Sequence, residues 1–333
     1  MKAVVLKASG GIENLELQTV PDPVPGASEV LLSVRACALN HLDLWVREGL
    51  PGSKIKMPHI LGSDVAGETD GRRVAVYPGL FCGVCPACAD GRESDCPDFG
   101  IIGAYGGSQG GYAEKLAVKT AHLLDIPDGL SFQEASSLPL TLLTAWRMLK
   151  TLGEVKAGQT VLVIGAGAGV SVAAVQIAKA LGARVIATTS DAAKVERARG
   201  LGADHVLLSP PADLPRCVRR LTGAMMADVV CEHVGPALFM DALKCLRPSG
   251  RLVTCGSTSG PKVELDMRYM FSRQLRIIGS HMGSLAEMRE AWKLVEAGKV
   301  RPVVDKVFAL DAAAAAHSRL ESRGHFGKIV LAL

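Results

Sequence analysis

The sequence predicts an α/β protein of two domains, one rich in short strands and one built on a parallel sheet covered by helices. The chain has 333 residues, and at about 150 residues per domain this length corresponds to about two domains. After about residue 129, short β-branched runs alternate with helical patterns, as in doubly wound parallel sheets. Before that point, turn residues separate short apolar runs, which is typical of β-rich domains.

The composition is that of a globular protein without a nucleic-acid or membrane surface. Apolar residues make up 48% of the chain and charged residues 21%, which is enough apolar material for two cores. The 37 basic and 33 acidic residues give a net charge of +4, and no basic stripe or polybasic patch stands out. The start MKAVVLKASG has no apolar secretory segment, and nine cysteines are too sparse for a disulfide scaffold. We therefore expect a reducing, cytoplasmic location.

The first domain is expected to begin with strands at Ala3–Leu6 and Val30–Val34, separated by the turn-rich segment Pro21–Gly26. Residues 40–107 are irregular apart from short strands such as Arg73–Tyr77. So irregular a segment needs a further stabiliser, and its cysteines suggest one.

The second domain is expected to open with a helix whose start carries the capping box Ser131–Glu134, followed by a helix at Thr141–Leu152. The strands predicted after it are Val161–Ile164, Arg184–Thr188, His205–Leu208, Asp228–Cys231, Arg251–Cys255 and Gln274–Ser280. The helices between them are predicted at Val170–Leu181, Ala192–Leu201, Pro215–Thr222 and Ala237–Leu246. The tail, from the helix Leu285–Ala297 to the strand Lys328–Leu333, is expected to return to the first domain.

An uncharged stretch from Ala157 to Ala178 is long enough to suggest a membrane helix, but a β-branched run, glycines and a helical run divide it. We interpret it as a strand, a tight turn at 165–169 and a buried helix. Glycines at a helix start let backbone amides approach a pyrophosphate, and the helix dipole favours the anion. This context favours a dinucleotide site over a mere packing turn. The site is expected at Gly167, Ala168, Gly169 and Val170.

The end of the next predicted strand distinguishes two dinucleotides. NAD-binding domains usually place an acid there to hold the ribose 2′-hydroxyl. This chain instead has Thr189 and Ser190, which do not repel a 2′-phosphate, and Lys194 follows one helical turn further on. Asp191 would be the NAD acid in a shifted register. We expect NADP(H), with NAD as the alternative.

Four cysteines gather in the irregular part of the first domain, at Cys82, Cys85, Cys88 and Cys96. Four thiolates at this spacing can surround one ion tetrahedrally and leave no open position for a substrate. The spacing predicts a structural zinc site, with an iron–sulfur cluster as the alternative.

Over nearly its whole length the chain resembles the medium-chain dehydrogenase/reductase superfamily, which includes zinc alcohol dehydrogenases and quinone oxidoreductases. The cysteine spacing matches the structural-zinc lobe of that family, here at about residues 80–100. The resemblance implies a GroES-like catalytic domain at 1–128 and 281–333 and a Rossmann domain at 129–280. It also implies that Thr144, Gly256 and Ser257 lie against the nicotinamide.

The chain differs from zinc-dependent members of this superfamily at the positions that bind their catalytic metal. Those members use a cysteine, a Gly-His-Glu motif and a further cysteine or acid, and the matching ligand positions here are Asn40, Ser63 and Leu140. The positions of their relay hydroxyl and histidine are Leu42 and Trp45. The usual three-ligand site therefore cannot be assembled.

The pair Asn40 and Asp43 is instead similar to the pattern of metal-free quinone oxidoreductases. The resemblance implies that Asn40 and Ser63 orient the substrate oxygen or the cofactor ribose and that Trp45 forms an apolar wall. Asp43 and Asp64 are expected to be anchors rather than proton donors, and no sequence feature identifies the proton source, a role open to water.

Other residues could still supply a catalytic zinc with unusual ligands. Cys37, His41 and His59 lie in the same region as the two aspartates. Strand alternation makes Cys37 a small buried residue instead, and the histidines are expected to be ordinary polar residues. The remaining cysteines, predicted to be small core residues, are Cys217, Cys231, Cys245 and Cys255.

Together these features imply an NADP(H)-dependent oxidoreductase acting on a quinone, an enone, or another small aldehyde or alcohol, with structural zinc and without catalytic zinc. Conjugation spreads the charge that develops on hydride transfer, so a Lewis acid is less necessary. The alternatives are a zinc alcohol dehydrogenase with altered ligands and a non-catalytic NADPH-binding protein. A homo-oligomer, dimer or tetramer, is expected to form through the apolar edge strand at 274–280.

Overall fold

Two units make up the computed structural model, which describes residues 1–52, 55–208 and 213–333. Unit 1 comprises Met1–Thr141, Gly283–Trp292 and Pro302–Leu333. Unit 2 comprises Leu142–Met282 and Lys293–Arg301. Each unit has its own sheet and core, and the C-terminal strand of the chain belongs to unit 1.

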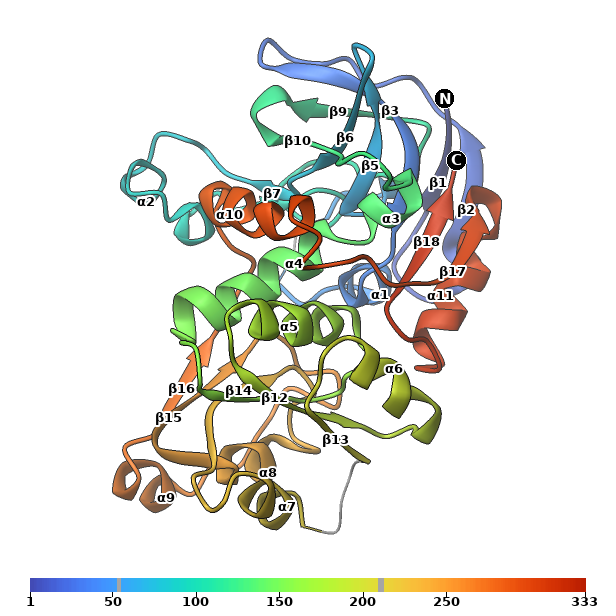
Figure 1. The fold of residues 1–333 in the computed structure, drawn as a ribbon. Coiled ribbons are helices and arrows are strands. Elements are labelled where there is room, and N and C mark those ends of the chain that lie inside the picture. Colours follow the sequence, from blue (N-terminus) through green and yellow to red (C-terminus); the bar gives the residue numbers. More distant parts are fainter. Residues whose placement is uncertain (53–54, 209–212) are drawn as a thin grey trace. The chain divides into compact units, whose positions relative to one another are not determined.

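Unit 1 is built on a seven-stranded sheet with the order β10-β6-β5-β3-β18-β17, in which β9 also pairs with β3. Its strands are β3 (Glu29–Ala38), β5 (Asp64–Thr69), β6 (Arg72–Val76), β9 (Lys115–Lys119), β10 (Leu123–Asp125), β17 (Val304–Ala309) and β18 (Lys328–Ala332). The long strand β3 lies between β5 and β18, which come from opposite ends of the sequence (Figure 1). Ala38 at the end of β3 therefore faces both Asp64 and Val330.

Smaller elements complete unit 1. A three-stranded sheet contains β1 (Lys2–Leu6), β2 (Leu15–Thr19) and β4 (His59–Ile60), and a two-stranded one contains β7 (Gly79–Leu80) and β8 (Gly100–Ile101). The helices are α1 (His41–Glu48), α2 (Pro86–Ala89), α3 (Phe132–Ser136), α10 (Leu285–Glu296, shared with unit 2) and α11 (Ala313–Glu321). The predicted capping box is confirmed at the start of α3, where the Glu134 amide donates to the Ser131 hydroxyl over 3.2 Å.

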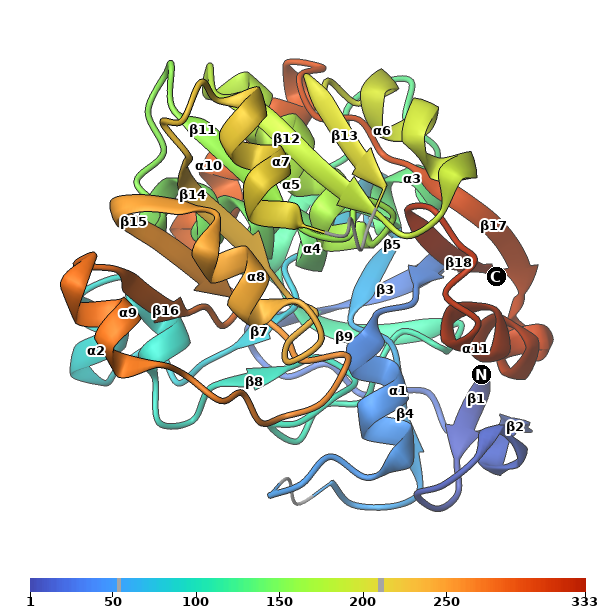
Figure 2. The same cartoon turned by 90° about the horizontal axis from the view of Figure 1, so that it is seen from below.

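Unit 2 contains the predicted parallel sheet, with the strand order β13-β12-β11-β14-β15-β16. The strands are β11 (Thr160–Val163), β12 (Arg184–Thr189), β13 (His205–Leu208), β14 (Ala227–Glu232), β15 (Leu246–Thr254) and β16 (Arg276–Gly279). The helices are α4 (Pro139–Trp146, begun in unit 1), α5 (Gly169–Ala180), α6 (Val195–Gly200), α7 (Leu214–Leu221), α8 (Phe239–Lys244) and α9 (Met267–Ser272). Helices α5 and α6 cover one face of the sheet, and α7 and α8 cover the other (Figures 1 and 2). The α/β fold class is confirmed.

Several element boundaries differ from the sequence prediction; the strand expected to end at Val34, for example, extends to Ala38. The helix expected at Thr141–Leu152 begins at Pro139, and its last part, Arg147–Leu152, has π-helical hydrogen bonds. The strand expected to begin at 251 begins at Leu246, because Leu246 already pairs with Ala227 before a register shift in the ladder. The helix before it is therefore shorter than expected, since it ends at Lys244.

The uncharged stretch at 157–178 forms the strand, turn and helix expected of it. Strand β11 is fully buried, and α5 buries eight consecutive residues from Ser171 to Ala178. In the described parts of the chain, no helix has the length and apolar character needed to cross a bilayer.

Candidate functional site

In unit 1, the link between β3 and α1 places Asn40 and Asp43 together. Asn40 lies just after the end of β3 at Ala38. Its backbone N–H donates to Asp43 Oδ2 over 2.6 Å, across the first turn of α1. Asp43 Oδ1 accepts a second bond, 3.1 Å long, from the Gly62 amide. Burial raises the pKa of Asp43 to about 7, although these two bonds and the nearby Lys328 favour its ionised form.

Gly62 explains how the chain enters strand β5 at this site. Its φ is +103°, which favours glycine. A Cβ at this position would lie 2.5 Å from the ring of Tyr112 and 2.6 Å from Cys37 Sγ. Position 62 therefore needs glycine, and the close packing fixes the backbone directly before Ser63.

Asp64 is fully buried and ties three segments together. Its Oδ2 accepts from the Asn40 side-chain amide over 2.9 Å and from Lys328 Nζ over 2.8 Å. Its Oδ1 accepts from the Leu140 backbone amide over 2.7 Å. Lys328 Nζ also donates to Asn40 Oδ1 over 2.5 Å. Asn40, which stands at a zinc-ligand position in the resemblance, and Asp64, which follows the second such position, thus share one buried ammonium group.

The other residues singled out in this region have separate surroundings. Ser63 is fully buried, and its hydroxyl has no hydrogen-bond partner among the described residues. Trp45 on α1 is half-buried and makes an edge contact with His41, at 5.3 Å between ring centroids. His59 is buried in β4, and burial lowers its pKa. Cys37 is fully buried in β3, as expected, and burial raises its pKa.

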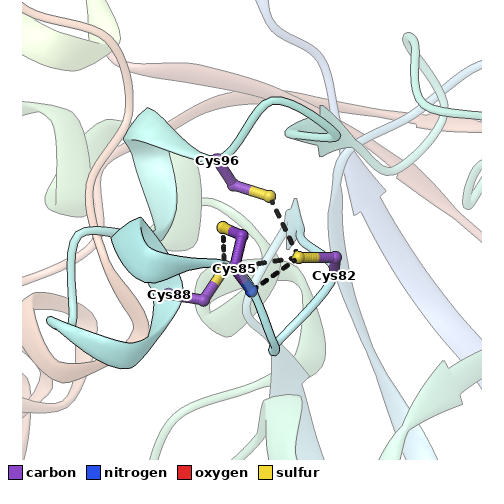
Figure 3. A group of neighbouring side chains, drawn as sticks. All are labelled: Cys82, Cys85, Cys88 and Cys96. Carbon is purple, nitrogen blue, oxygen red and sulfur yellow. Dashed lines mark hydrogen bonds between the residues drawn. The ribbon is translucent and has the colours of Figure 1, made fainter.

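The four-cysteine cluster is the one group of three or more metal-ligating side chains that come within reach of one ion in the described chain. All four sulfur atoms lie within 4.8 Å of one another, and Figure 3 shows them converging from the loop around α2. The Sγ atoms of Cys85 and Cys88 are 3.5 Å apart, and those of Cys82 and Cys96 are 3.6 Å apart. Tetrahedral zinc with Zn–S bonds of about 2.3 Å needs sulfur separations of about 3.8 Å. The cluster therefore fits a single zinc ion.

Backbone amides prepare this cluster for a cation. The amides of Val84 and Cys85 donate to Cys82 Sγ over 3.5 and 3.4 Å. These bonds lower the pKa of the Cys82 thiol to about 6. Since a thiolate is the form that binds a metal, the loop favours the ligating state of Cys82 before an ion arrives, whereas burial and the neighbouring thiols raise the pKa of Cys88 to about 12.

In unit 2, the glycine-rich turn joins β11 to α5 at the carboxyl edge of the sheet. Gly165 has φ +70°, and a Cβ there would lie 3.2 Å from the imidazole of His233. No side chain caps the start of α5 at Ala168, so the first-turn amides at 169–171 stay available for an anion. The turn fits the pyrophosphate of a dinucleotide.

The end of β12 lies beside this turn, because Thr188 Oγ1 accepts from the Gly165 amide over 3.1 Å. Thr189 is buried at the end of the strand, and Ser190 is exposed. Asp191 Oδ1 accepts from the Ala193 amide over 2.9 Å, so this carboxylate caps the short helical turn that contains Lys194.

Sequence reasoning missed His233, which follows β14 and supports the glycine turn from behind. Its Nε2 lies 2.9 Å from Ser171 Oγ and 3.0 Å from the Ile164 carbonyl. The loop that holds Gly256 and Ser257 packs beside it, since a Cβ at Gly256 would lie 3.1 Å from the His233 carbonyl. Sequence reasoning also missed Lys328 in unit 1. In the sequence each is a lone residue, without a motif around it.

The remaining predicted residues have the following places. Thr144 lies in α4 and is buried. Cys231 and Cys245 are buried core residues, as predicted. Cys217 and Cys255 are only half-buried, because Cys217 lies near the exposed face of the short helix α7 and Cys255 follows the end of β15.

Two family models match the chain. A GroES-like alcohol dehydrogenase domain matches residues 26–128, and the model described as "Zinc-binding dehydrogenase" matches residues 169–297. The first match lies in unit 1 and contains the four-cysteine cluster, and the second contains the start of α5 and the strands that follow.

Individual relatives are similar to this chain over nearly its full length. A quinone oxidoreductase of Pseudomonas aeruginosa is 32% identical over 99% of both chains, and an acryloyl-coenzyme A reductase of Sulfurisphaera tokodaii is 29% identical over 99% of both. A solved structure described as an NAD-dependent alcohol dehydrogenase is 44% identical, covers 100% of both chains and superposes with a TM-score of 0.96. Together with the dinucleotide turn and the cysteine cluster, these likenesses show that the chain belongs to the medium-chain dehydrogenase/reductase superfamily, as an NAD(P)-dependent oxidoreductase.

Proposed function

We propose that this protein reduces enones or quinones with NADP(H) and does so without a catalytic zinc ion. The observation that carries the proposal is the hydrogen-bonded cluster of Asn40, Asp64 and Lys328. Asn40, at one of the positions that would hold the metal in zinc-dependent members of the superfamily, is bound to an ammonium group of the chain itself, and so is Asp64, next to a second such position.

The chemistry of these side chains supports this proposal. Zinc sites in proteins are formed by cysteine, histidine and carboxylate ligands, whereas positions 40 and 63 carry an amide and a hydroxyl. The two acids of this region are already engaged, since Asp64 accepts three hydrogen bonds and Asp43 accepts two. A second cation beside the Lys328 ammonium would also be repelled.

The substrate class follows from the donors that remain. Bound NADP(H) would supply or accept the hydride. Asn40 and Ser63 offer an amide N–H and a hydroxyl to a carbonyl oxygen, which is weaker stabilisation than a metal ion gives. Such donors suit a conjugated acceptor, in which the developing charge is spread over several atoms. Trp45 would form the apolar wall, Asp43 and Asp64 would anchor the donors, and water would deliver the proton.

The choice of NADP(H) is part of this proposal. Gly167, Ala168, Gly169 and Val170 would bind the pyrophosphate, and Thr144, Gly256 and Ser257 would line the nicotinamide. Thr189, Ser190 and Lys194 would receive the 2′-phosphate. The capping bond of Asp191 supports this choice, because it engages the one nearby carboxylate that would otherwise select NAD.

One set of assays tests the proposal. The purified protein is supplied with NADPH or NADH and an enone, an enoyl thioester, a quinone or an aldehyde, and in reverse with the oxidised cofactors and alcohols. We expect enone or quinone reduction with NADPH and one zinc ion per chain by metal analysis. Two zinc ions per chain, one of them lost together with activity on chelation, would support an alcohol dehydrogenase with altered ligands. Tight NADPH binding without turnover of any substrate would support a non-catalytic protein.

We also propose a cytoplasmic homo-oligomer. Strand β16 lies at the end of the unit 2 sheet, and Met267 and Phe271 on the neighbouring helix α9 are 62% and 70% exposed. An apolar sheet edge of this kind favours pairing with a second copy. Light scattering should give a dimer or tetramer, and Ile278→Lys in β16 should shift the protein toward the monomer. A wild-type monomer at micromolar concentration would contradict this proposal.

A further inference from the structure

Lys328 is a buried cation that no sequence motif indicated. It opens strand β18, its side chain is 6% exposed, and it lies in the same sheet as β3 because β18 and β3 are antiparallel neighbours. Its ammonium group donates to one oxygen of Asp64 and to the side-chain oxygen of Asn40, at 2.8 and 2.5 Å. In the proposed function this lysine opposes a second cation but has no part in binding or orienting the substrate.

The Lys328–Asp64 pair determines which way the Asn40 amide faces. An ammonium group only donates hydrogen bonds, and an ionised carboxylate only accepts them. Asn40 satisfies both with its oxygen toward Lys328 and its nitrogen toward Asp64, 2.9 Å away. The flipped amide would place N–H groups against the ammonium and a carbonyl oxygen against the carboxylate. Both contacts would be repulsive in a buried setting, where leaving polar groups unpaired is costly.

The fixed amide leaves one donor unused. Asn40 Nδ2 carries two hydrogens, and one of them binds Asp64. The oxygen of the amide faces Lys328 and accepts a hydrogen bond from its ammonium group. The second Nδ2 hydrogen makes no bond among the described residues, so Asn40 presents a free N–H donor.

We infer that Lys328 is a positioning residue that, through Asp64, makes Asn40 a hydrogen-bond donor of fixed orientation for the substrate carbonyl. This inference rests on the proposed function, which gives Asn40 its contact with the substrate oxygen. Lys328 itself acts through Asn40. A neutral residue at 328 would leave Asn40 free to present its oxygen instead, and an oxygen repels the developing enolate or alkoxide.

A structural role must be separated from this positioning role. Removing Lys328 alone leaves the fully buried Asp64 without its cation, and an uncompensated buried charge is destabilising. The double variant Lys328→Met/Asp64→Asn removes both charges. Asn at position 64 can pair with either orientation of the Asn40 amide. The double variant therefore carries no uncompensated buried charge, but it no longer selects one orientation of Asn40.

The experiment compares the melting temperature, the turnover number and the enone KM of five proteins: wild type, Asn40→Ala, Lys328→Met, Lys328→Met/Asn40→Ala and Lys328→Met/Asp64→Asn. We expect Lys328→Met to lower kcat at least tenfold, with an unchanged NADPH Kd. Adding Asn40→Ala should cause little further loss, because both changes remove the same donor. The charge-neutral double variant should recover the melting temperature but not kcat.

Two outcomes would overturn the inference. One is recovery of kcat together with the melting temperature in the charge-neutral variant, and the other is a full additional loss when Asn40→Ala is added to Lys328→Met. The matched control is Arg319→Met, which breaks the Arg319–Asp305 ion pair elsewhere in unit 1. It should lower stability without changing kcat.

A second readout does not depend on turnover. The two side-chain amide protons of Asn40, assigned by their loss in Asn40→Ala, should give two distinct signals in ¹⁵N-labelled wild type. In Lys328→Met they should shift and approach each other as the amide begins to flip. Unchanged signals in that variant would overturn the inference even if no substrate of the panel is turned over. A wild type without activity, but with the expected amide signals, would contradict only the proposed function.

Discussion

His317 Nε2 lies 3.2 Å from the hydroxyl of Tyr112, and both side chains are fully buried in unit 1. On its other side, His317 Nδ1 lies 3.5 Å from Arg47 Nη1. Since a guanidinium only donates, Nδ1 accepts, and Nε2 carries the proton toward Tyr112. This arrangement requires a neutral imidazole. Burial, assisted by the charge of Arg47, lowers the pKa of His317 to about 3.

The first prediction is an acid destabilisation caused by His317. The unfolded chain binds a proton at this position below about pH 6.5, whereas the fold excludes it until about pH 3. Stability is therefore present above pH 6.5 and is lost progressively as the pH falls. Between pH 7 and pH 5 the contribution lost is about 2 kcal/mol. His317→Gln should reduce the fall in unfolding free energy between these two pH values by that amount.

Tyr112→Phe is the matched control for this measurement. It removes the hydroxyl that contacts His317 but leaves the imidazole buried, so the pH dependence should persist although overall stability drops. Urea unfolding at pH 5, 6 and 7 provides both quantities. An equal pH dependence in wild type and His317→Gln would contradict the explanation.

The second prediction concerns Gly62. Alanine at this position would combine a left-handed backbone with Cβ distances of only 2.5 Å to the Tyr112 ring and 2.6 Å to Cys37 Sγ. We expect Gly62→Ala to destabilise unit 1 by about 3 kcal/mol. Gly129→Ala is the control, since Gly129 has φ +86° but open space around its Cβ position. Gly129→Ala should lower the free energy of unfolding by about 1 kcal/mol. If both variants lost the same unfolding free energy, the side chains around Gly62 would have to move aside at little cost, which would contradict the prediction.

The sequence was sufficient for the regular part of the fold. Each strand of the parallel sheet is a short β-branched run between helical patterns, and the capping box at Ser131 is a local signal that the structure confirms. Boundaries failed where tertiary pairing decided them, as at Leu246, which joins the sheet through Ala227. Local patterns contain no information on such a pairing.

The candidate site was predictable only in part. The cysteine cluster spans fifteen consecutive residues, so its spacing alone indicates a metal. Lys328 and Asp64, in contrast, lie 264 positions apart, and the pairing of β3 with β18 on one side and β5 on the other brings them together. A lysine at the start of a C-terminal strand is ordinary in sequence. Its importance arises from the buried carboxylate and amide that the sheet places beside it.

The third prediction concerns the metal lobe. Cys88→Ser should lose the zinc ion, because three thiolates and a hydroxyl bind zinc much more weakly than four thiolates. Stability should fall by about 4 kcal/mol, as for the loss of a structural metal. Cys217→Ser on α7 should keep the wild-type zinc content. Metal analysis that finds one zinc ion per chain in Cys88→Ser would contradict this prediction.

The fourth prediction concerns the cofactor. If Lys194 pairs with the 2′-phosphate of NADPH, Lys194→Ala should raise the NADPH Kd about tenfold, the loss expected for one charge-assisted bond. The NADH Kd should stay unchanged, because NADH has no phosphate at that position. Fluorescence titration of the bound nicotinamide measures both constants.

Lys179→Ala provides the control for this last comparison. Lys179 lies near the C-terminal end of α5 and pairs with Asp204 over 2.9 Å. Its removal changes the net charge of unit 2 by the same amount as Lys194→Ala, so a general electrostatic effect would weaken NADPH binding in both variants. A specific contact predicts weaker binding only in Lys194→Ala. A wild type that binds NADH at least as tightly as NADPH would assign the selecting role to Asp191, and Asp191→Ala should then weaken NADH binding instead.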